Sequence, residues 1–488
     1  MDAAQSTQGL QCATGASYAR RRPESTLLYQ IVERHYPKFL ETLGASGRSL
    51  PGHVQREFED YLKCGRLEHG FLRVRCEACH AEKLVAFSCK RRGFCPSCGA
   101  RRMVESAALL VDRVLPEVPM RQWVLSVPFA LRYLFAREPA AMGAALAVVY
   151  RTLAAFQRRK TGYRRGEAHC DAVTLIQRFG SALNLNVHFH MLMPDGVYLG
   201  AGARPEFVRA AAPTALELQG LVEQIGRRLG RQLERRGILV RDADSVYLEL
   251  EPQSQGDALA GLQGHSITYR VAVGRRQGQK AFTLQTLGAR GEGHGGERLA
   301  QANGFSLHAG VAAEAEERGK LERLCRYISR PAVATQRLSL TAQGEIRYAL
   351  KTPYRDGTTH VVFEPADFIL RLAALVPSPR VNLTRFHGVF APHHRLRAGI
   401  SARRSERTDG GAGSGTSRSS ALGWAQRLKR VFSIDVERCD RCGGGVRIIA
   451  CIEDAAVIEK ILRHLGLDGG SSAGAMARAP PAQAGLVD

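Results

Sequence analysis

The stretch VHFHMLMPDGV, residues 187 to 197, sets two histidines one residue apart in an otherwise apolar run that ends in a Pro-Asp-Gly turn. Successive side chains of a β-strand point to opposite faces, so His188 and His190 share one face and the apolar residues beside them share the other. Two neighbouring imidazoles can chelate one divalent ion while the apolar face anchors the strand in a core. The alternative is one buried and one exposed histidine that only make hydrogen bonds.

The preceding segment AHCDAVTLIQRFG predicts a second strand, joined to the first by the short connection SALNL. Such a hairpin brings Gln177 near the histidine pair, where its amide oxygen can serve as a third ligand. Asp195, in the turn, is a weaker candidate. Two nitrogens and one oxygen leave open positions for substrate oxygens, which suits polarisation of a phosphate by Mg²⁺ or Mn²⁺.

The overall charge points to a polyanionic partner. The chain has 69 Lys and Arg residues against 46 Asp and Glu, a net charge of +23, which attracts nucleic acid or reflects only a basic, well-solvated surface. No run of 18 uncharged apolar residues occurs, and the first 25 residues lack the apolar stretch of a secretory signal. We therefore expect a cytoplasmic protein that does not contact a membrane.

The cysteines indicate zinc rather than disulfides, because the chain has 12 of them and a cytoplasmic protein keeps thiols reduced. In CEACHAEKLVAFSCKRRGFCPSC, Cys76 and Cys79 form one CxxC pair and Cys95 and Cys98 form another. Two such pairs predict one tetrahedral zinc site, structural because four thiolates leave no open coordination position. The alternative is four free buried thiols.

Other cysteines leave further metal sites open. A second zinc ion is an option for four residues in or beside the same block: Cys64, His69, His80 and Cys89. Near the C-terminus, Cys439 and Cys442 form another CxxC with Cys451 nearby. This is half of a zinc ribbon, so a metal there needs ligands from elsewhere in the chain.

Several segments together resemble one family. The segments are QRFGSALNLNVHFHMLMPDGVY, the cysteine block, LCRYISRPAV, LKTPYRDGTTHVVFEP and LTRFHGVFAP. They are similar to the HUH single-strand DNA endonucleases and, within these, to the rolling-circle transposases of insertion sequences and common regions. The resemblance covers roughly residues 27 to 400. It implies an α+β fold: an antiparallel HUH sheet with flanking helices, an N-terminal zinc-ribbon-like module and a small C-terminal piece.

The resemblance also implies a nucleophilic tyrosine on a helix beside the histidine strand, and the matching position is Tyr327. Some members carry a second tyrosine four residues away, but here those positions are Arg323 and Pro331, as in single-tyrosine members. The implied reaction is attack of Tyr327 on single-stranded DNA, which leaves a 5′-phosphotyrosyl enzyme and a free 3′-hydroxyl. Arg326 is its neighbour in sequence.

Predicted DNA contacts come from three groups of residues. The zinc block carries a basic, phosphate-facing patch: Lys90, Arg91, Arg92, Arg101 and Arg102. The resemblance adds Arg323, Arg326, Lys351, Arg355 and His360. Possible stacking platforms for bases are Phe94, Tyr354 and Phe386, although single aromatics are more often part of a core.

The predicted organisation follows from these motifs and from composition. Its parts are a loose tail (1–25), a helical and zinc-binding DNA-binding domain (26–104), the catalytic domain (105–400) with a helical insertion at about 210–310, a flexible linker (401–420), a small C-terminal segment (421–468) and a disordered tail (469–488).

We therefore expect a bacterial, nucleoid-associated transposase that needs Mg²⁺ or Mn²⁺ and structural Zn²⁺. Its expected partners are single-stranded DNA at element ends, target DNA, and a host helicase or the replication machinery, because no Walker A motif is present. It can also form a homo-oligomer. The alternatives are a plasmid replication initiator or relaxase, and a zinc protein that binds DNA without catalysis.

Overall fold

The computed structural model describes residues 22–200, 205–242, 246–249, 258–271, 276–285, 298–354, 356–401 and 437–467. Residues 1–21 of the predicted N-terminal tail, the predicted C-terminal tail, nearly all of the predicted linker, and Arg355 lie outside the described residues. Contacts divide the chain into two units, each built from separate segments. The smaller unit comprises Met1–Pro23, Cys64–Ser88 and Gly415–Asp488, and the larger unit comprises Glu24–Lys63 and Cys89–Ser414.

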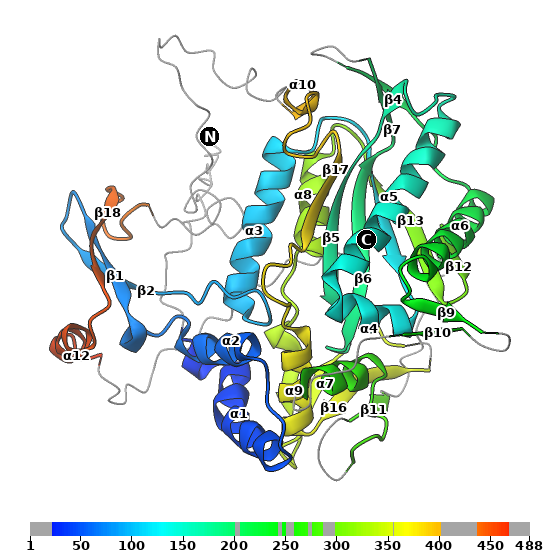
Figure 1. The fold of residues 1–488 in the computed structure, drawn as a ribbon. Helices are drawn as coiled ribbons and strands as arrows, with labels where there is room; N and C mark the ends of the chain where they lie inside the picture. Colours follow the sequence, from blue (N-terminus) through cyan, green and yellow to red (C-terminus); the bar gives the residue numbers. More distant parts are fainter. Residues whose placement is uncertain are drawn as a thin grey trace, which may run out of the picture. The chain divides into compact units, whose positions relative to one another are not determined.

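The larger unit is built on a six-stranded sheet in the order β12-β13-β3-β6-β5-β17, in which every neighbouring pair is antiparallel (Figure 1). The predicted hairpin is confirmed, because β5 pairs with β6. The fold class is α+β, as predicted. The strands are β3 (Met120–Ser126), β5 (Asp171–Phe179), β6 (Leu185–Pro194), β12 (Leu299–Ala302), β13 (Phe305–Ala313) and β17 (Thr384–Gly388).

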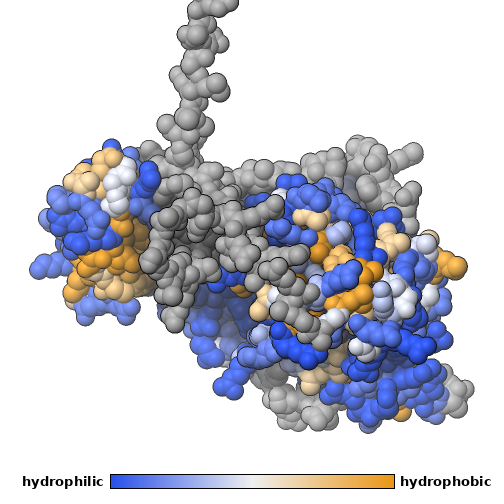
Figure 2. All heavy atoms as spheres, turned by 90° about the horizontal axis from the view of Figure 1, so that it is seen from above, coloured by the Kyte–Doolittle hydropathy of each residue, from blue (hydrophilic) through white to orange (hydrophobic). Residues whose placement is uncertain are grey.

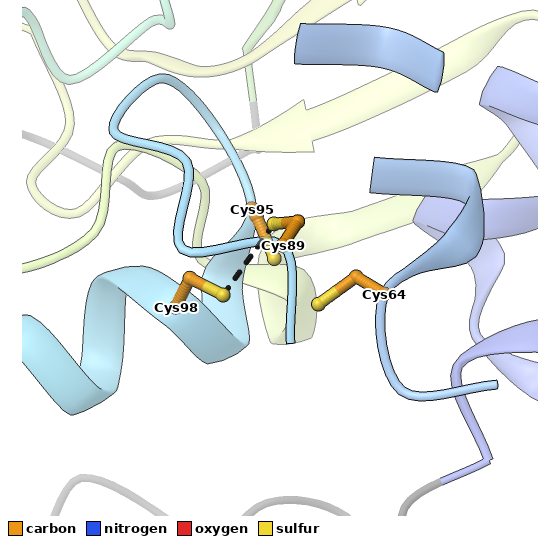
Figure 3. A group of neighbouring side chains, drawn as sticks. All are labelled: Cys64, Cys89, Cys95 and Cys98. Carbon is orange, nitrogen blue, oxygen red and sulfur yellow. Dashed lines mark hydrogen bonds between the residues drawn. The ribbon is translucent and has the colours of Figure 1, made fainter. Parts of the chain in front are cut away.

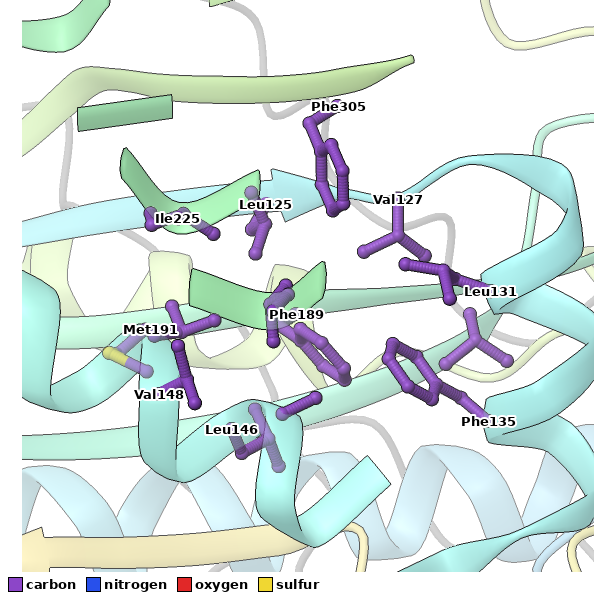
Figure 4. Packing of buried hydrophobic residues seen from close by; sticks show 14 of the residues in the cluster. Leu125, Val127, Leu131, Phe135, Leu146, Val148, Phe189, Met191, Ile225 and Phe305 are labelled. Atoms are coloured by element: carbon purple, nitrogen blue, oxygen red, sulfur yellow. The ribbon is translucent and has the colours of Figure 1, made fainter. Parts of the chain in front are cut away.

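One face of this sheet forms the main hydrophobic core (Figure 4). Phe189 and Met191 of β6 pack there against Phe135 and Leu146 from the covering helices. These helices are α4 (Phe129–Arg137), α5 (Pro139–Lys160) and α6 (Ala215–Glu234). Among the described helices, α5 alone has the length and apolarity to cross a membrane, but its apolar side chains are buried in this core.

The opposite face of the sheet is covered by α3 (Pro96–Arg113) and α8 (Arg318–Ile328), which pack against each other. Leu175 of β5 and Leu192 of β6 lie in one cluster with Leu324 of α8. The residues of β6 that alternate with Phe189 and Met191 therefore point toward these two helices. His188 and His190 are among them.

A second, four-stranded sheet in the larger unit has the order β11-β16-β15-β14. Its strands are β11 (Phe282–Gln285), β14 (Leu338–Leu340), β15 (Ile346–Ala349) and β16 (Thr358–Phe363), and two smaller sheets contain β4 (Ala168–His169), β7 (Gly196–Leu199), β8 (Glu206–Arg209), β9 (Leu239–Arg241) and β10 (Val246–Leu248). The remaining helices of this unit are α1 (Leu27–Ala45), α2 (Gly52–Lys63), α7 (Ala258–Ile267), α9 (Pro365–Leu375) and α10 (Arg397–Ser401).

The smaller unit joins two segments that are far apart in sequence. Its antiparallel sheet has the order β18-β1-β2, so the C-terminal strand pairs with the strand that ends in the first CxxC. Four buried apolar residues form its core: Leu67, Phe71, Ile458 and Leu462. Its elements are β1 (Phe71–Cys76), β2 (Glu82–Ala86), β18 (Val446–Ile452) and α12 (Ala455–His464).

The described surface is mostly hydrophilic on the face drawn in Figure 2, with separate hydrophobic patches. Exposed large apolar side chains include Leu216 in the larger unit and Ile448 in the smaller one. A largely polar surface agrees with the high content of arginine and lysine.

Candidate functional site

Four thiols converge where α2 ends and α3 begins (Figure 3). The sulfur atoms of Cys64, Cys89, Cys95 and Cys98 all lie within 4.8 Å of one another, and Cys89 and Cys98 are 3.4 Å apart. Cys64 directly follows the last residue of α2, so that helix sets its position, and Cys95 is the N-cap of α3. Four thiols at this separation match the ligand set of a tetrahedral zinc site.

The smaller unit contains a second cluster of four thiols. The sulfur atoms of Cys76, Cys79, Cys439 and Cys442 lie within 4.8 Å of one another, with Cys76 to Cys442 and Cys79 to Cys439 both at 3.5 Å. The pairing of β1 with β18 brings the C-terminal CxxC beside the turn between β1 and β2. This cluster also has the ligand set of a closed, structural zinc site.

The predicted grouping of Cys76 and Cys79 with Cys95 and Cys98 is therefore wrong. The first pair lies at a turn of the smaller unit, whereas the second pair lies at the start of α3 in the larger unit. Each pair completes its set with cysteines that the CxxC spacing does not reveal. Among the described residues, His69, His80 and Cys451 belong to neither cluster.

The two histidines lie in the middle of the large sheet, because β6 runs between β3 and β5. His188 is opposite Gln177, and His190 is opposite Leu175. Their ring centroids are 4.9 Å apart, and the residues are only 9% and 5% exposed. The imidazoles therefore stand side by side on the face that α3 and α8 cover.

Hydrogen bonds orient both rings. His188 Nδ1 lies 2.8 Å from the carbonyl oxygen of Asn186, so Nδ1 carries the proton and Nε2 keeps its lone pair. Nε2 of the Gln122 side-chain amide lies 2.6 Å from Nδ1 of His190 and donates to it, which puts the proton of the neutral ring on its Nε2. With the Gln122 amide turned over, its oxygen accepts from Nδ1 instead, and the lone pair is left on Nε2 of His190 as well. In metal sites, a hydrogen bond to the ring nitrogen that does not bind the metal fixes the orientation of the histidine.

Three buried polar atoms near the pair have no hydrogen-bond partner among the described residues. They are Nε2 of His190, Oε1 of Gln177 and Oδ1 of Asn186. Gln177 donates from Nε2 to the carbonyl of Ile328 at 2.9 Å, which leaves its oxygen free. Buried polar atoms without partners are costly, so this set fits a bound cation.

Both imidazoles are neutral at pH 7. Burial lowers the pKa of His188 to about 4, with a smaller contribution from the charge of Arg330. Burial also lowers the pKa of His190 well below its usual value, helped by His188 and Arg330. Neutral imidazole is the form that binds metal ions, so the electrostatics of the site favour ligation over protonation.

Asp195 does not join this site. Its carboxylate accepts two hydrogen bonds from the Arg121 guanidinium, at 2.8 and 2.7 Å, and this ion pair is buried. Arg121 also donates to the carbonyl of Ala309. Both oxygens of Asp195 are therefore engaged, and its candidacy as a metal ligand is wrong.

Tyr327 lies near the C-terminal end of α8, half-buried against the cluster that covers the histidine face. The guanidinium carbon of Arg330 is 4.2 Å from the centroid of its ring, and Nζ of Lys351 is 4.6 Å from it. The hydrogen bond from Gln177 to Ile328, the next residue, ties this part of α8 to β5. Arg330 also acts electrostatically on both histidines, so the three side chains share one basic environment.

Most of the predicted DNA-contacting arginines already have protein partners. Arg91 pairs with Asp60, Arg101 with Glu105, Arg92 donates to the carbonyl of Val381, and Arg102 donates to the carbonyls of Lys90 and Arg91. Lys90 and Arg323 are exposed, and Arg326 is half-buried. His360 lies on β16 beside Thr359.

Phe94 cannot act as a stacking platform for bases. It is 1% exposed, and its ring packs against those of Phe58 and Tyr61 at centroid distances of 4.7 and 5.2 Å. It is a core residue of the helical region. Phe386 and Tyr354 are half-buried, and Phe386 packs against the cluster of α3 and α8.

Two known families match this chain. Residues 172–397 match the family described as "Putative transposase", and residues 31–127 match the family described as "Transposase zinc-binding domain", of the IS91 type. Searches of curated proteins and of solved structures found no match. The chain therefore combines a transposase domain with a zinc-binding domain found in transposases.

Together these two matches indicate a chain similar to transposases of the IS91 type, a family that suggests a nuclease or transesterase activity. The zinc-domain match contains six of the eight clustered cysteines, and Cys439 and Cys442 lie outside it. Sequence reasoning did not identify Asn186, Gln122 or Arg330 as part of the histidine site. Of these three residues, only Asn186 could have been identified from the sequence, because it precedes His188 by two residues and therefore lies on the same face of the strand.

Proposed function

We propose that this protein nicks and rejoins single-stranded DNA through a covalent bond to Tyr327, and thereby drives rolling-circle-type transposition of an insertion sequence. The observation that carries the proposal is the pair of buried, neutral imidazoles on the sheet face covered by the helix of Tyr327. A purely structural sheet has no need of unpaired polar atoms at that position.

His188, His190 and Gln177 would hold the divalent cation, and Asn186 offers a further oxygen. The donor set fits Mg²⁺ or Mn²⁺, and its two nitrogens favour Mn²⁺. Bound there, the ion would supply Lewis-acid polarisation of the scissile phosphate. The hydrogen bonds of Asn186 and Gln122 would fix the ring orientations, so that ligation costs little side-chain entropy.

The proposed chemical step is a transesterification. The Tyr327 oxygen forms a bond to phosphorus, the bond from phosphorus to the 3′ oxygen breaks, the phenol loses its proton and the 3′ oxygen gains one. Arg330 and Lys351, beside the tyrosine ring, would stabilise the negative charge that develops on the phenol and the phosphate. One phosphodiester replaces another, so a target 3′-hydroxyl can reverse the step without ATP.

The two zinc centres and the arginine-rich surface would recognise element ends, and the exposed Lys90 and Arg323 are free to contact phosphates. The other proposed partners are target DNA, a host helicase or the replication machinery, and a second copy of the chain. We place the protein in the bacterial cytoplasm at the nucleoid.

Labelled oligonucleotides test the proposal. A single-stranded oligonucleotide that spans an element end, labelled at either terminus, is incubated with Mn²⁺ or Mg²⁺ and the full-length protein. We expect the label on the 3′ fragment to become covalently attached to protein, and Tyr327→Phe to abolish the attachment. Tyr247→Phe, at an exposed tyrosine, is the matched control and should retain it.

The same assay separates the alternatives. His188→Ala with His190→Ala should abolish the adduct and spare DNA binding, whereas Cys76→Ser should weaken folding or end recognition. Binding without an adduct, across end sequences and metals, would support a non-catalytic zinc protein. An adduct formed only on a plasmid origin would support a replication initiator or relaxase.

A further inference from the structure

A cavity of about 130 Å³ in the larger unit lies beside the proposed active site. It is bounded by the start of α3, the end of β5 and the segment that follows Tyr327. Its lining includes five arginines and no acidic residue: Arg91, Arg92, Arg102, Arg178 and Arg330. A cavity with this lining concentrates positive charge.

Arg178 is the unusual member of this group. It is only 6% exposed, and it lies at the register shift between Gln177 and Phe179 at the end of β5. Its hydrogen bonds to described residues are long, at 3.4 Å to the carbonyls of Leu375 and Ala374. Among the described residues it has no ion pair. Bulges of this kind often re-aim a side chain next to an active site.

Arg178 is buried, and the guanidinium of an arginine stays protonated in proteins. A buried cation without a counter-charge is strongly unfavourable in a folded protein. The free protein therefore carries an electrostatic cost that an anion in the cavity would remove.

The carboxylates near the cavity interact with Arg91 and Arg102 instead of with Arg178. Asp60 pairs with Arg91, and Glu57 accepts from the backbone of Gly93 while it faces Arg91 and Arg102. Arg330 has no described acidic partner and rests on the Tyr327 ring. The first turn of α3 also borders the cavity, with its positive helix end.

We propose that this cavity binds a phosphate group of the DNA strand that Tyr327 cleaves, with Arg178 as its buried counter-charge. This inference rests on the proposed function. Arg330 borders the cavity and also contacts the Tyr327 ring, so the bound phosphate is a close neighbour of the scissile one. A fixed neighbouring phosphate would hold the scissile bond in register with the tyrosine.

The test compares Arg178→Met with Arg235→Met in the full-length, zinc-loaded protein. Arg235 is exposed on the surface just after α6, so its substitution removes the same charge away from the cavity. Affinity for a single-stranded oligonucleotide is measured by fluorescence anisotropy at several salt concentrations, and stability by urea denaturation without DNA. Arg178→Lys serves as the second variant if Arg178→Met fails to fold.

We expect Arg178→Met to weaken DNA binding by about tenfold or more and to reduce the salt slope by about 0.7, the value for one phosphate contact on a single strand. Its urea midpoint should be no lower than that of the wild type. Arg178→Lys keeps the charge but loses the planar fork, so its affinity should lie between the two. Arg235→Met should have a much smaller effect on binding.

Two results would overturn the inference. A lower urea midpoint with unchanged DNA affinity would mean that Arg178 is structural, balanced by the negative charge of a zinc centre with four thiolates. Stabilisation by inorganic phosphate that depends on Arg178, again with unchanged DNA affinity, would mean a site for free phosphate. If the wild type forms no tyrosyl adduct at all, the proposed function fails instead, whatever Arg178 does.

Discussion

Replacing the C-terminal cysteines, Cys439→Ser with Cys442→Ser, should remove one of two zinc ions and disorder the smaller unit. Among the described residues of this unit, the core cluster contains only four buried apolar side chains, which is a very small core for an independently stable domain. In small zinc modules, metal binding contributes about 10 kcal/mol or more, so the metal should supply most of the unit's stability. The thiols of Cys76 and Cys79 alone offer two of the four ligands.

The assay measures zinc per chain by elemental analysis, together with hydrogen exchange of the backbone amides. We expect about two zinc ions in the wild type and about one in the double variant, with loss of protection in β1 and β18. The larger unit should keep its free energy of unfolding within about 0.5 kcal/mol, because distant substitutions act independently. Cys451→Ser, on β18 but outside the cluster, is the matched control and should retain two zinc ions.

Two results would refute this reasoning. If the double variant still binds two zinc ions, Cys439 and Cys442 are not ligands. If it binds one zinc but β1 and β18 remain protected, the pairing of these strands does not depend on the metal.

Two further predictions concern the large sheet. Lowering the pH from 7 to 5 should reduce the free energy of unfolding by about 2 kcal/mol through His188, because its unfolded form takes up a proton below about 6.5 whereas its folded form does so only near 4. Urea denaturation at both pH values should show a smaller loss in His188→Gln, and an equal loss would contradict this. Arg121→Leu should destabilise the protein by about 3 to 5 kcal/mol, because it leaves the buried carboxylate of Asp195 unpaired. A loss below 1 kcal/mol in urea would show that Asp195 is protonated or solvated, and Arg209→Leu, at an exposed pair with Glu314, is the control.

Local patterns in the sequence were sufficient to predict the central hairpin. Strict alternation around His188 and His190, with a short connection before them, specifies both the strand pair and the face of each side chain. The same alternation would have revealed Asn186. The location of Tyr327 on a helix that covers this face came from the resemblance, since one tyrosine near a helix end carries no such signal.

The zinc sites could not be predicted from spacing, because each combines cysteines from separate segments. A CxxC pair fixes two ligands locally, but the other two depend on tertiary pairing, such as that of β1 with β18. The contact partners of Asp195 and Phe94 could not be predicted from the sequence for the same reason. Arg121 and Phe58 are distant in sequence and meet them only in the folded chain.

The central claim is that Tyr327 becomes joined to DNA, and mass spectrometry of the adduct tests it most directly. Trypsin should release YISRPAVATQR, which begins at Tyr327, since the bond between Arg330 and Pro331 resists cleavage. After reaction with a single-stranded element end and nuclease digestion, we predict a nucleotide phosphate on the tyrosine of this peptide, and none after Tyr327→Phe. An unmodified peptide in protein that has cleaved the DNA, or a nucleotide attached to another residue, would contradict the account.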